Sequence, residues 1–177
     1  MTQPRFYYDL ASPESYFVAE RALHALGEVP EWIPVRDDSL AFRCAAEVDA
    51  YKEDVARRAD ALGLMALRWP DRFPADTDWA ILAATYAKQI GRGVAFSLAA
   101  FRQAFAAGRD LSERDNVLIA AAACEMHPLA LTKGAQLRGT RDALAANAAR
   151  AQADGVTSVP AIWVAGRLLE GERAVPA

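Results

Sequence analysis

Residues 5–15 read RFYYDLASPES, a strand-like run that leads directly into the start of a helix. The run 5–10 is mostly aromatic and apolar, which is typical of a strand on a buried surface. Ser12 is a preferred helix N-cap, Pro13 is favoured at the first helical position, and Glu14 places an acid in the first turn. The stretch predicts a strand–helix corner, and the exposed N–H groups of such a helix start stabilise an anion such as a thiolate.

A second strand is predicted after that helix. The helix should run from residue 13 to about residue 26 and end at Gly27. Residues 31–36, which follow Pro30, have the composition of a strand. Strand, helix and strand in this order predict a parallel βαβ unit. The helix has an apolar face with residues at helical spacing, namely Phe17, Val18, Ala22, Leu23 and Leu26.

The middle of the chain is rich in alanine and is predicted to be helical. Residues 68–74, RWPDRFP, contain too much proline for a helix or a strand and predict a rigid loop. Two short strand-like runs, 161–164 and 167–170, are joined by Ala165 and Gly166, which predicts a tight hairpin. The order is therefore βαβ, a block of helices, and a hairpin. The helices are predicted at residues 50–62, 77–90, 94–107, 112–126 and 140–153.

Length, composition and charge restrict the function classes. The 177 residues, 53% of them hydrophobic, suit one domain with one core. The net charge of −3 and the scattered basic residues argue against nucleic acid as a partner, and no apolar window is long enough for a membrane helix. The two cysteines, Cys44 and Cys124, lie far apart, so we expect no structural disulfide and a cytoplasmic location. Cys124 and His127 together make a poor metal site, and no metal is expected.

A second informative segment precedes the hairpin. Residues 155–164 read GVTSVPAIWV, so that Pro160 stands directly before a strand. Only about 5–6% of X–Pro bonds in folded proteins are cis, and an ordinary trans proline at a strand entry is the competing interpretation. The context strengthens the case for a special peptide bond, because the chain also carries the Ser12–Pro13 corner after its first predicted strand.

These motifs resemble the DsbA-type branch of the thioredoxin superfamily. Within it the chain is most similar to 2-hydroxychromene-2-carboxylate isomerases and kappa-class glutathione transferases. The resemblance rests on FYYDLASPESY at 6–16 and GVTSVPA at 155–161, with support from FRQAF at 101–105 and GRDLS at 108–112. It implies an α/β thioredoxin-like fold in a single domain, residues 1–177, with a largely helical insertion at 40–153.

The resemblance also implies a glutathione site. Ser12 matches the serine whose hydroxyl holds the glutathione sulfur as a thiolate. Ser158, Val159 and a cis Pro160 match the segment that pairs with the tripeptide, and Glu172 matches an acid that meets its γ-glutamyl amine. The family chemistry is reversible addition of that thiolate to a conjugated substrate, bond rotation and elimination. From their loop positions, a substrate pocket is predicted from Tyr16, Trp69 and Phe73, with Arg36 or Arg68 for a substrate carboxylate.

The sequence departs from the family pattern in two places. After the hairpin, residues 169–173, LEGER, are one residue shorter than the family's Gly-x-Asp-Arg-like turn. The family's final helix is expected to be absent or truncated, which would leave one sheet face less covered. The residues ADTD at 75–78 replace an asparagine-bearing loop. Both changes affect the predicted substrate and glutathione contacts.

Three functional alternatives remain, besides the simple interpretation of Ser12 as a helix cap. The first is a glutathione-dependent isomerase or transferase that acts on a small aromatic or conjugated acid. The second is a binding module that takes an extended peptide beside Pro160 without catalysis. The third, a disulfide oxidoreductase, is disfavoured because serine stands at positions 12 and 15 and the chain has no Cys-x-x-Cys. A homodimer is compatible with the alanine-rich helices.

Overall fold

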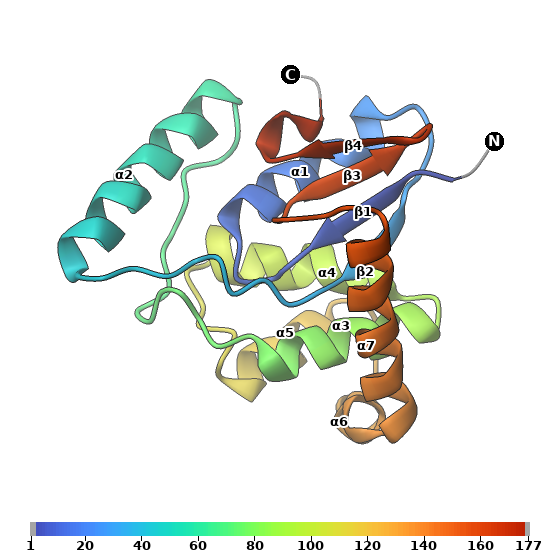
Figure 1. Ribbon diagram of the computed structural model, residues 1–177. Coiled ribbons are helices and arrows are strands. Elements are labelled where there is room, and N and C mark those ends of the chain that lie inside the picture. Colours follow the sequence, from blue (N-terminus) through green and yellow to red (C-terminus); the bar gives the residue numbers. More distant parts are fainter. Residues whose placement is uncertain (1–2, 176–177) are drawn as a thin grey trace.

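A four-stranded sheet forms the centre of the molecule (Figure 1). The computed structural model describes residues 3–175, without the side chains of Leu23, His24 and Arg173. The strands are β1 (Arg5–Tyr8), β2 (Glu31–Pro34), β3 (Ala161–Val164) and β4 (Arg167–Glu170), in the spatial order β2-β1-β3-β4. The β1 and β2 strands are parallel, whereas β3 is antiparallel to both of its neighbours, β1 and β4. The predicted βαβ unit and hairpin therefore share one sheet.

Helix α1 (Pro13–Ala25) follows β1 as the sequence predicts. Ser12 is its N-cap: the Ser12 hydroxyl oxygen accepts a hydrogen bond from the Ser15 N–H at 3.0 Å. Phe17 and Val18 are fully buried on the apolar face of this helix. The predicted position of Leu23 on the same face lies outside the described side chains. The cap and the apolar face explain why the chain reverses direction at this corner.

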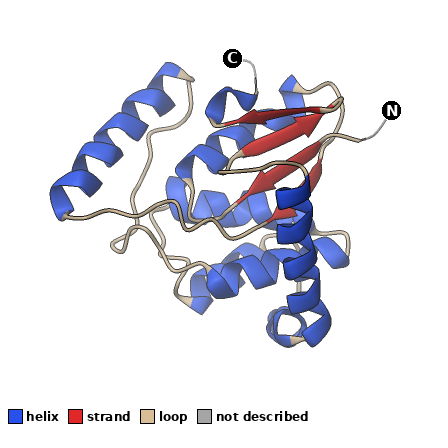
Figure 2. Ribbon diagram, viewed as in Figure 1, coloured by secondary structure: helices blue, strands red, loops and turns tan. Residues whose placement is uncertain are grey.

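Six further helices fill the segment between the βαβ unit and the hairpin (Figure 2). The predicted helix at 94–107 is α4 followed by a π-helical turn, Arg102–Ala106, and after β4 the described residues contain one short 3₁₀ turn, Glu172–Ala174. None of the described helices is both long and apolar enough to cross a membrane. The six helices are α2 (Ala45–Ala61), α3 (Asp78–Gln89), α4 (Gly93–Phe101), α5 (Arg114–Ala122), α6 (Pro128–Gln136) and α7 (Arg138–Ala153).

Helix α6 is absent from the sequence prediction, which ended a helix near Met126 and left the following residues unassigned. The structure shows His127 as the N-cap of α6, where its Nδ1 accepts a hydrogen bond from the Leu129 N–H at 3.2 Å. Pro128 then occupies the first turn, where a missing N–H costs nothing. In α6, Gly134 allows close contact with α3, because a Cβ at this position would lie 2.4 Å from the Tyr86 ring.

Helices cover the two sheet faces unequally. On one face, Phe6, Tyr8 and Trp32 join a large core built with α1, α3, α4 and α5. On the other face, Tyr7 and Ile33 belong to a smaller core completed by Ala151 of α7 and other residues. Figure 1 shows α7 crossing in front of the sheet and α1 and α4 behind it. The alternation of Phe6, Tyr7 and Tyr8 between the faces follows from the two-residue period of a strand.

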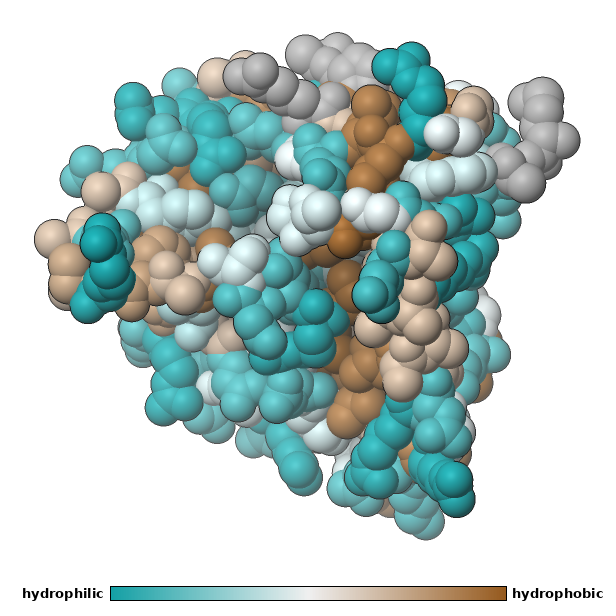
Figure 3. Space-filling view, viewed as in Figure 1, coloured by the Kyte–Doolittle hydropathy of each residue, from teal (hydrophilic) through white to brown (hydrophobic). Residues whose placement is uncertain are grey.

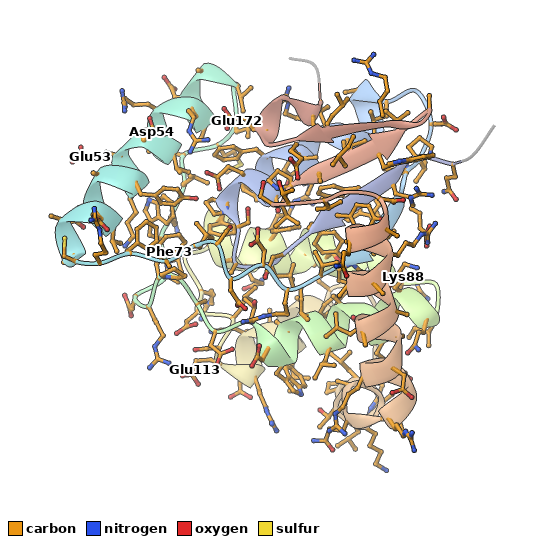
Figure 4. All side chains as sticks on the ribbon, viewed as in Figure 1. Glu53, Asp54, Phe73, Lys88, Glu113 and Glu172 are labelled. Atoms are coloured by element: carbon orange, nitrogen blue, oxygen red, sulfur yellow. The ribbon has the colours of Figure 1, made fainter. Side chains whose placement is uncertain are left out.

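A charge cluster connects β2 to the helices on both sides of the sheet. Glu31 of β2 accepts from Lys88 of α3 and from Arg150 of α7, each at 2.8 Å. Figure 4 labels Lys88 beside α7. Partial burial tends to raise the pKa of Glu31, but the hydrogen bond and charge of Lys88 and the charge of Arg150 outweigh it, so the pKa is lowered. The ionised carboxylate is therefore favoured in the folded state.

The variant Glu31→Gln should lower the free energy of unfolding at neutral pH by about 1 kcal/mol, since the cluster is partly exposed. A lowered folded-state pKa stabilises the fold above the unfolded-state value of about 4.3, and this contribution is lost as the pH falls through the folded-state pKa. The difference between wild type and variant should therefore shrink below about pH 4.3. Urea unfolding at several pH values measures it, and a difference that is constant with pH would contradict the prediction.

Candidate functional site

The corner cavity lies where α1 begins, between the sheet and α2, and has a volume of about 690 Å³. Ser12 reaches it from the end of β1, while Val159 and Pro160 reach it from the segment before β3. They meet because β3 pairs alongside β1. The Val159–Pro160 peptide bond is cis, as the resemblance implies. The lining consists of Asp9, Ser12, Glu14, Asp37, Ser39, Leu40, Tyr51, Asp54, Arg58, Val159, Pro160, Glu170, Gly171 and Glu172.

The Ser12 hydroxyl is available to a ligand in the corner cavity. Ser12 is 3% exposed, and its oxygen is used as an acceptor by the Ser15 N–H. Within residues 3–175, the Ser12 hydroxyl proton has no acceptor. Ser15, the other serine that stands at a cysteine position of the redox motif, is fully buried and does not line the cavity. Ser12 therefore both caps α1 and retains a hydrogen-bond donor for an anion at the helix N-terminus.

Behind Ser12 lies Asp9, a buried carboxyl group that the sequence prediction did not assign to the site. It is 1% exposed and accepts hydrogen bonds from the Ala11 N–H, the Thr77 hydroxyl and the Asp37 N–H, at 2.8–3.0 Å. Burial raises the pKa of Asp9 in spite of these donors. Thr77 is the N-cap residue of α3, but its hydroxyl donates to Asp9 and makes no cap hydrogen bond to the helix. Asp9 therefore holds three segments together at the back of the cavity.

The backbone donor beside Pro160 is already in use. The Val159 N–H donates to Asp37 Oδ2 at 2.9 Å, and Asp37 also accepts from the Ser39 N–H through its other oxygen. An extended ligand that pairs with the Val159 N–H must displace the Asp37 carboxylate. The sequence gives little indication that Asp37 belongs to the site, because Asp37 lies in a polar turn of the kind that usually follows a strand.

Helix α2 closes the other side of the cavity through charged side chains. Arg58 of α2 bonds to Glu14 at 2.8 Å, to Glu172 at 2.9 Å and to Asp54 at 2.8 Å. Tyr51 of α2 donates to the second oxygen of Glu14 at 2.6 Å. Glu172, the residue at the position implied for the γ-glutamyl contact, lines the cavity but is paired with Arg58 (Figure 4). Arg58 therefore joins α1, α2 and the turn after β4.

Ser158 lies next to the cavity rather than in its lining. Its N–H donates to Glu170 at 3.0 Å, and the Thr157 N–H and hydroxyl bond to the same carboxylate. Burial works to raise the pKa of Glu170, but these hydrogen bonds from Thr157 and Ser158 lower it overall. The loop before Pro160 is thus held against the end of β4.

The residues predicted for the substrate pocket do not line the corner cavity. Trp69 and Phe73 belong to an aromatic cluster with Phe42 and Tyr51 at the base of α2. Tyr16 stacks on Phe105 at the edge of a separate recess of about 340 Å³. Arg36 is paired with Asp38 and Asp78, and Arg68 is likewise absent from the lining. Loop position in the sequence did not reveal which loops face the cavity.

Carboxylates dominate the corner cavity. Six of its lining residues are acidic, and Arg58 is the only basic residue among them. Both free cysteines lie elsewhere: Cys44 is exposed at the N-cap of α2, and Cys124 is buried after α5. The cavity therefore offers a hydroxyl donor, a helix N-terminus and a negative potential, without a thiol of its own.

Comparison with protein families identifies the fold. The DSBA-like thioredoxin domain matches residues 5–177. The chain belongs to this family. The order βαβ, helices, ββ and the cis Pro160 beside the start of α1 agree with the assignment. No curated protein sequence matches the chain significantly.

Solved structures similar to this DSBA-like chain include both isomerases and redox proteins. A 2-hydroxychromene-2-carboxylate isomerase is 16% identical with a TM-score of 0.82, covering 97% of this chain and 89% of that one. A probable DsbA oxidoreductase from Streptomyces coelicolor is 19% identical with a TM-score of 0.81, covering 98% and 85%. The cytosolic disulfide reductase DsbM from Pseudomonas aeruginosa, in a structure with GSH, is 14% identical with a TM-score of 0.68, covering 95% and 88%. At these identities the likeness shows the fold.

Proposed function

We propose that this DSBA-like protein binds the thiol of glutathione or a related peptide thiol at Ser12 and uses it as a thiolate. The observation that carries the proposal is the Ser12 hydroxyl, whose proton is unshared within the described residues and which lines a 690 Å³ cavity at the start of α1. The reaction would be that of an isomerase or transferase acting on a small conjugated compound. Similar structures of an isomerase and of a GSH complex support the choice of ligand.

The proposed chemistry follows from the donors at the corner. A free thiol has a pKa of about 8.5, and a helix N-terminus with a hydroxyl donor lowers it toward neutrality. The substrate has a carbon–carbon double bond conjugated with a carbonyl group. The thiolate adds to one carbon of the double bond, and the π electrons of that bond move onto the carbonyl oxygen. The former double bond then rotates, the electron pair returns, and the sulfur leaves with its original pair. The thiol is unchanged, so no external oxidant or reductant is needed.

The two alternatives have less support. Dithiol exchange at the corner lacks its reactants, because Ser12 and Ser15 replace cysteines and neither Cys44 nor Cys124 lines the cavity. Binding of an extended peptide without catalysis would pair with the same Val159 N–H as glutathione, which Asp37 occupies, and would make no use of the Ser12 hydroxyl. Free cysteines and the cytosolic DsbM relative favour a reducing, cytoplasmic location.

The variant Ser12→Ala tests the proposal. A hydrogen bond to a charged group contributes about 1.5–3 kcal/mol, so its loss should raise the pKa of the bound thiol by about one to two units. The pKa is measured from the ultraviolet absorbance of bound thiolate during a pH titration with glutathione. The matched control is Ser15→Ala, which removes a neighbouring hydroxyl that does not line the cavity.

A second variant separates binding from capping. Ser12→Gly also removes the donor, but glycine costs an N-cap only a few tenths of a kcal/mol. Ser12→Gly should therefore show the raised thiol pKa with a nearly unchanged melting temperature. The absence of any calorimetric heat with glutathione or its amide, or an unchanged thiol pKa in both Ser12 variants, would refute the proposed function.

A further inference from the structure

We propose that the corner cavity selects thiols that carry a net positive charge, such as a peptide thiol extended by an amine, over glutathione itself. This inference rests on the proposed function and concerns the substrate class of the same site. Glutathione has two carboxylates and one ammonium group and is therefore a net anion. The side chains around the cavity favour the opposite charge.

Arg58 is already neutralised by its own partners. Glu14, Asp54 and Glu172 each lie 2.8–2.9 Å from a different nitrogen of its guanidinium group. All three carboxylates line the corner cavity, so that this group carries more negative than positive charge. Asp54 is also paired with the exposed Arg57, which does not line the cavity, so a ligand carboxylate would have to compete with three protein carboxylates for Arg58. An ammonium group, in contrast, would reduce the repulsion among them.

The three remaining carboxylates lie around the Ser12 corner and beside Pro160. Asp37 accepts a hydrogen bond from the Val159 N–H, and Glu170 accepts from the Ser158 and Thr157 N–H groups, which lower the pKa of Glu170. Asp9 lies behind them, and because burial raises its pKa it contributes less to the negative charge than the other two; the Arg36 guanidinium is bonded to Thr77 and paired with Asp38 and Asp78. None of these three carboxylates has a basic partner in the lining of the cavity.

The Ser12 hydroxyl gives the cavity an orientation. It is a buried hydroxyl that lines the cavity, and it suits a ligand sulfur at the positive end of α1. The carboxylates of Asp54 and Glu172, which Figure 4 labels on α2 and on the turn after β4, line the same cavity from other elements of the fold. The surface over the C-terminal half of α2 is largely hydrophilic (Figure 3). A thiol at Ser12 and an amine at these carboxylates therefore match the groups that line the cavity.

The test compares three thiols that share the γ-glutamylcysteinylglycine skeleton. The first is glutathione, a net anion; the second is its glycine amide, which is neutral; the third carries a diamine on the glycine carboxyl group and is a net cation. Calorimetry at low salt should show affinity rising in this order, by about tenfold in total. The difference should shrink at high salt, where charges are screened. Equal affinities, or glutathione as the tightest ligand, would overturn the inference.

Matched variants on α2 locate the selectivity. Asp54→Asn should reduce the preference for the cationic thiol by several-fold, because Asp54 lines the cavity. Glu53→Gln makes the same change of charge at the neighbouring residue, which is exposed and does not line the cavity, and should leave the preference unchanged. An equal effect of both variants would show that the net charge of the protein, rather than the cavity, sets the order.

A thiol-free control separates the two proposals. In this control, serine replaces the cysteine of the cationic compound. If all three thiols bind equally and depend on Ser12, the proposed function stands and the charge selection fails. If the serine compound binds as tightly as its thiol counterpart, the charge selection stands and the proposed thiol function fails.

Discussion

The variant Phe101→Ala is expected to lose about 3–5 kcal/mol of unfolding free energy, the usual cost of emptying a buried aromatic site. The Phe101 ring is fully buried at the end of α4. Its centroid lies 5.7 Å from that of Tyr8 in β1 and 6.2 Å from that of Tyr16 in α1. The side chain therefore supports both elements that lead to and from the Ser12 corner. Since domains are stable by only about 5–15 kcal/mol, this loss is a large part of the total.

Urea unfolding followed by circular dichroism measures the Phe101→Ala effect. The control Leu129→Ala removes an apolar side chain that is 64% exposed in α6 and should change stability by less than about 0.5 kcal/mol. Phe101→Leu, which keeps much of the volume, should lie between the two. A loss below about 1 kcal/mol for Phe101→Ala would show that the core around β1 and α1 does not depend on this ring.

The variant Arg58→Met should destabilise the protein by about 2 kcal/mol and loosen α2, which forms one side of the corner cavity. Removing one partner of a buried ion pair costs about 3–5 kcal/mol, and the cost is smaller here because the groups are partly exposed. The side chains of Arg58, Glu14 and Glu172 are 29%, 18% and 21% exposed. Without the arginine, carboxylates from α1, α2 and the turn after β4 repel one another. Helix α2 should then move away from the start of α1.

The neighbouring residue provides the control for Arg58→Met. Arg57 is paired with Asp54, and its side chain is 77% exposed. Arg57→Met makes the same change of charge and shape, and should cost less than about 0.5 kcal/mol. Hydrogen exchange of the α2 amides distinguishes the two, because only Arg58→Met should increase exchange along the helix. Equal protection in both variants would mean that the aromatic cluster alone holds α2 in place.

Much of the fold could be predicted because its signals are local. The start of α1 depends on Ser12, Pro13 and Glu14, which are adjacent in the chain. The hairpin depends on Ala165 and Gly166, both of which have positive φ. The missed helix α6 shows the limit of this approach, because a histidine N-cap followed by proline resembles a helix end as much as a helix start.

The sequence identified residues of the cavity lining only where the family resemblance names them. Ser12, Val159, Pro160 and Glu172 line it, as the resemblance implies. The aromatic residues Trp69 and Phe73 instead pack against one another and under α2. An aromatic side chain in a loop can pack into the core or line a pocket, and the loop sequence does not distinguish these positions.

The amino-acid sequence by itself determined the order of the strands, most of the helices and the serine at the start of α1. Capping and periodicity depend on residues a few positions apart, so they act before the chain is folded. Only the tertiary structure decided that Arg58 joins Glu14, Asp54 and Glu172, that Asp37 takes the Val159 N–H, and that six carboxylates surround one cavity. The physical reason is that electrostatic and hydrogen-bond energies depend on distance in space, and these residues meet only when α2, the loop before β3 and the end of β4 pack around α1.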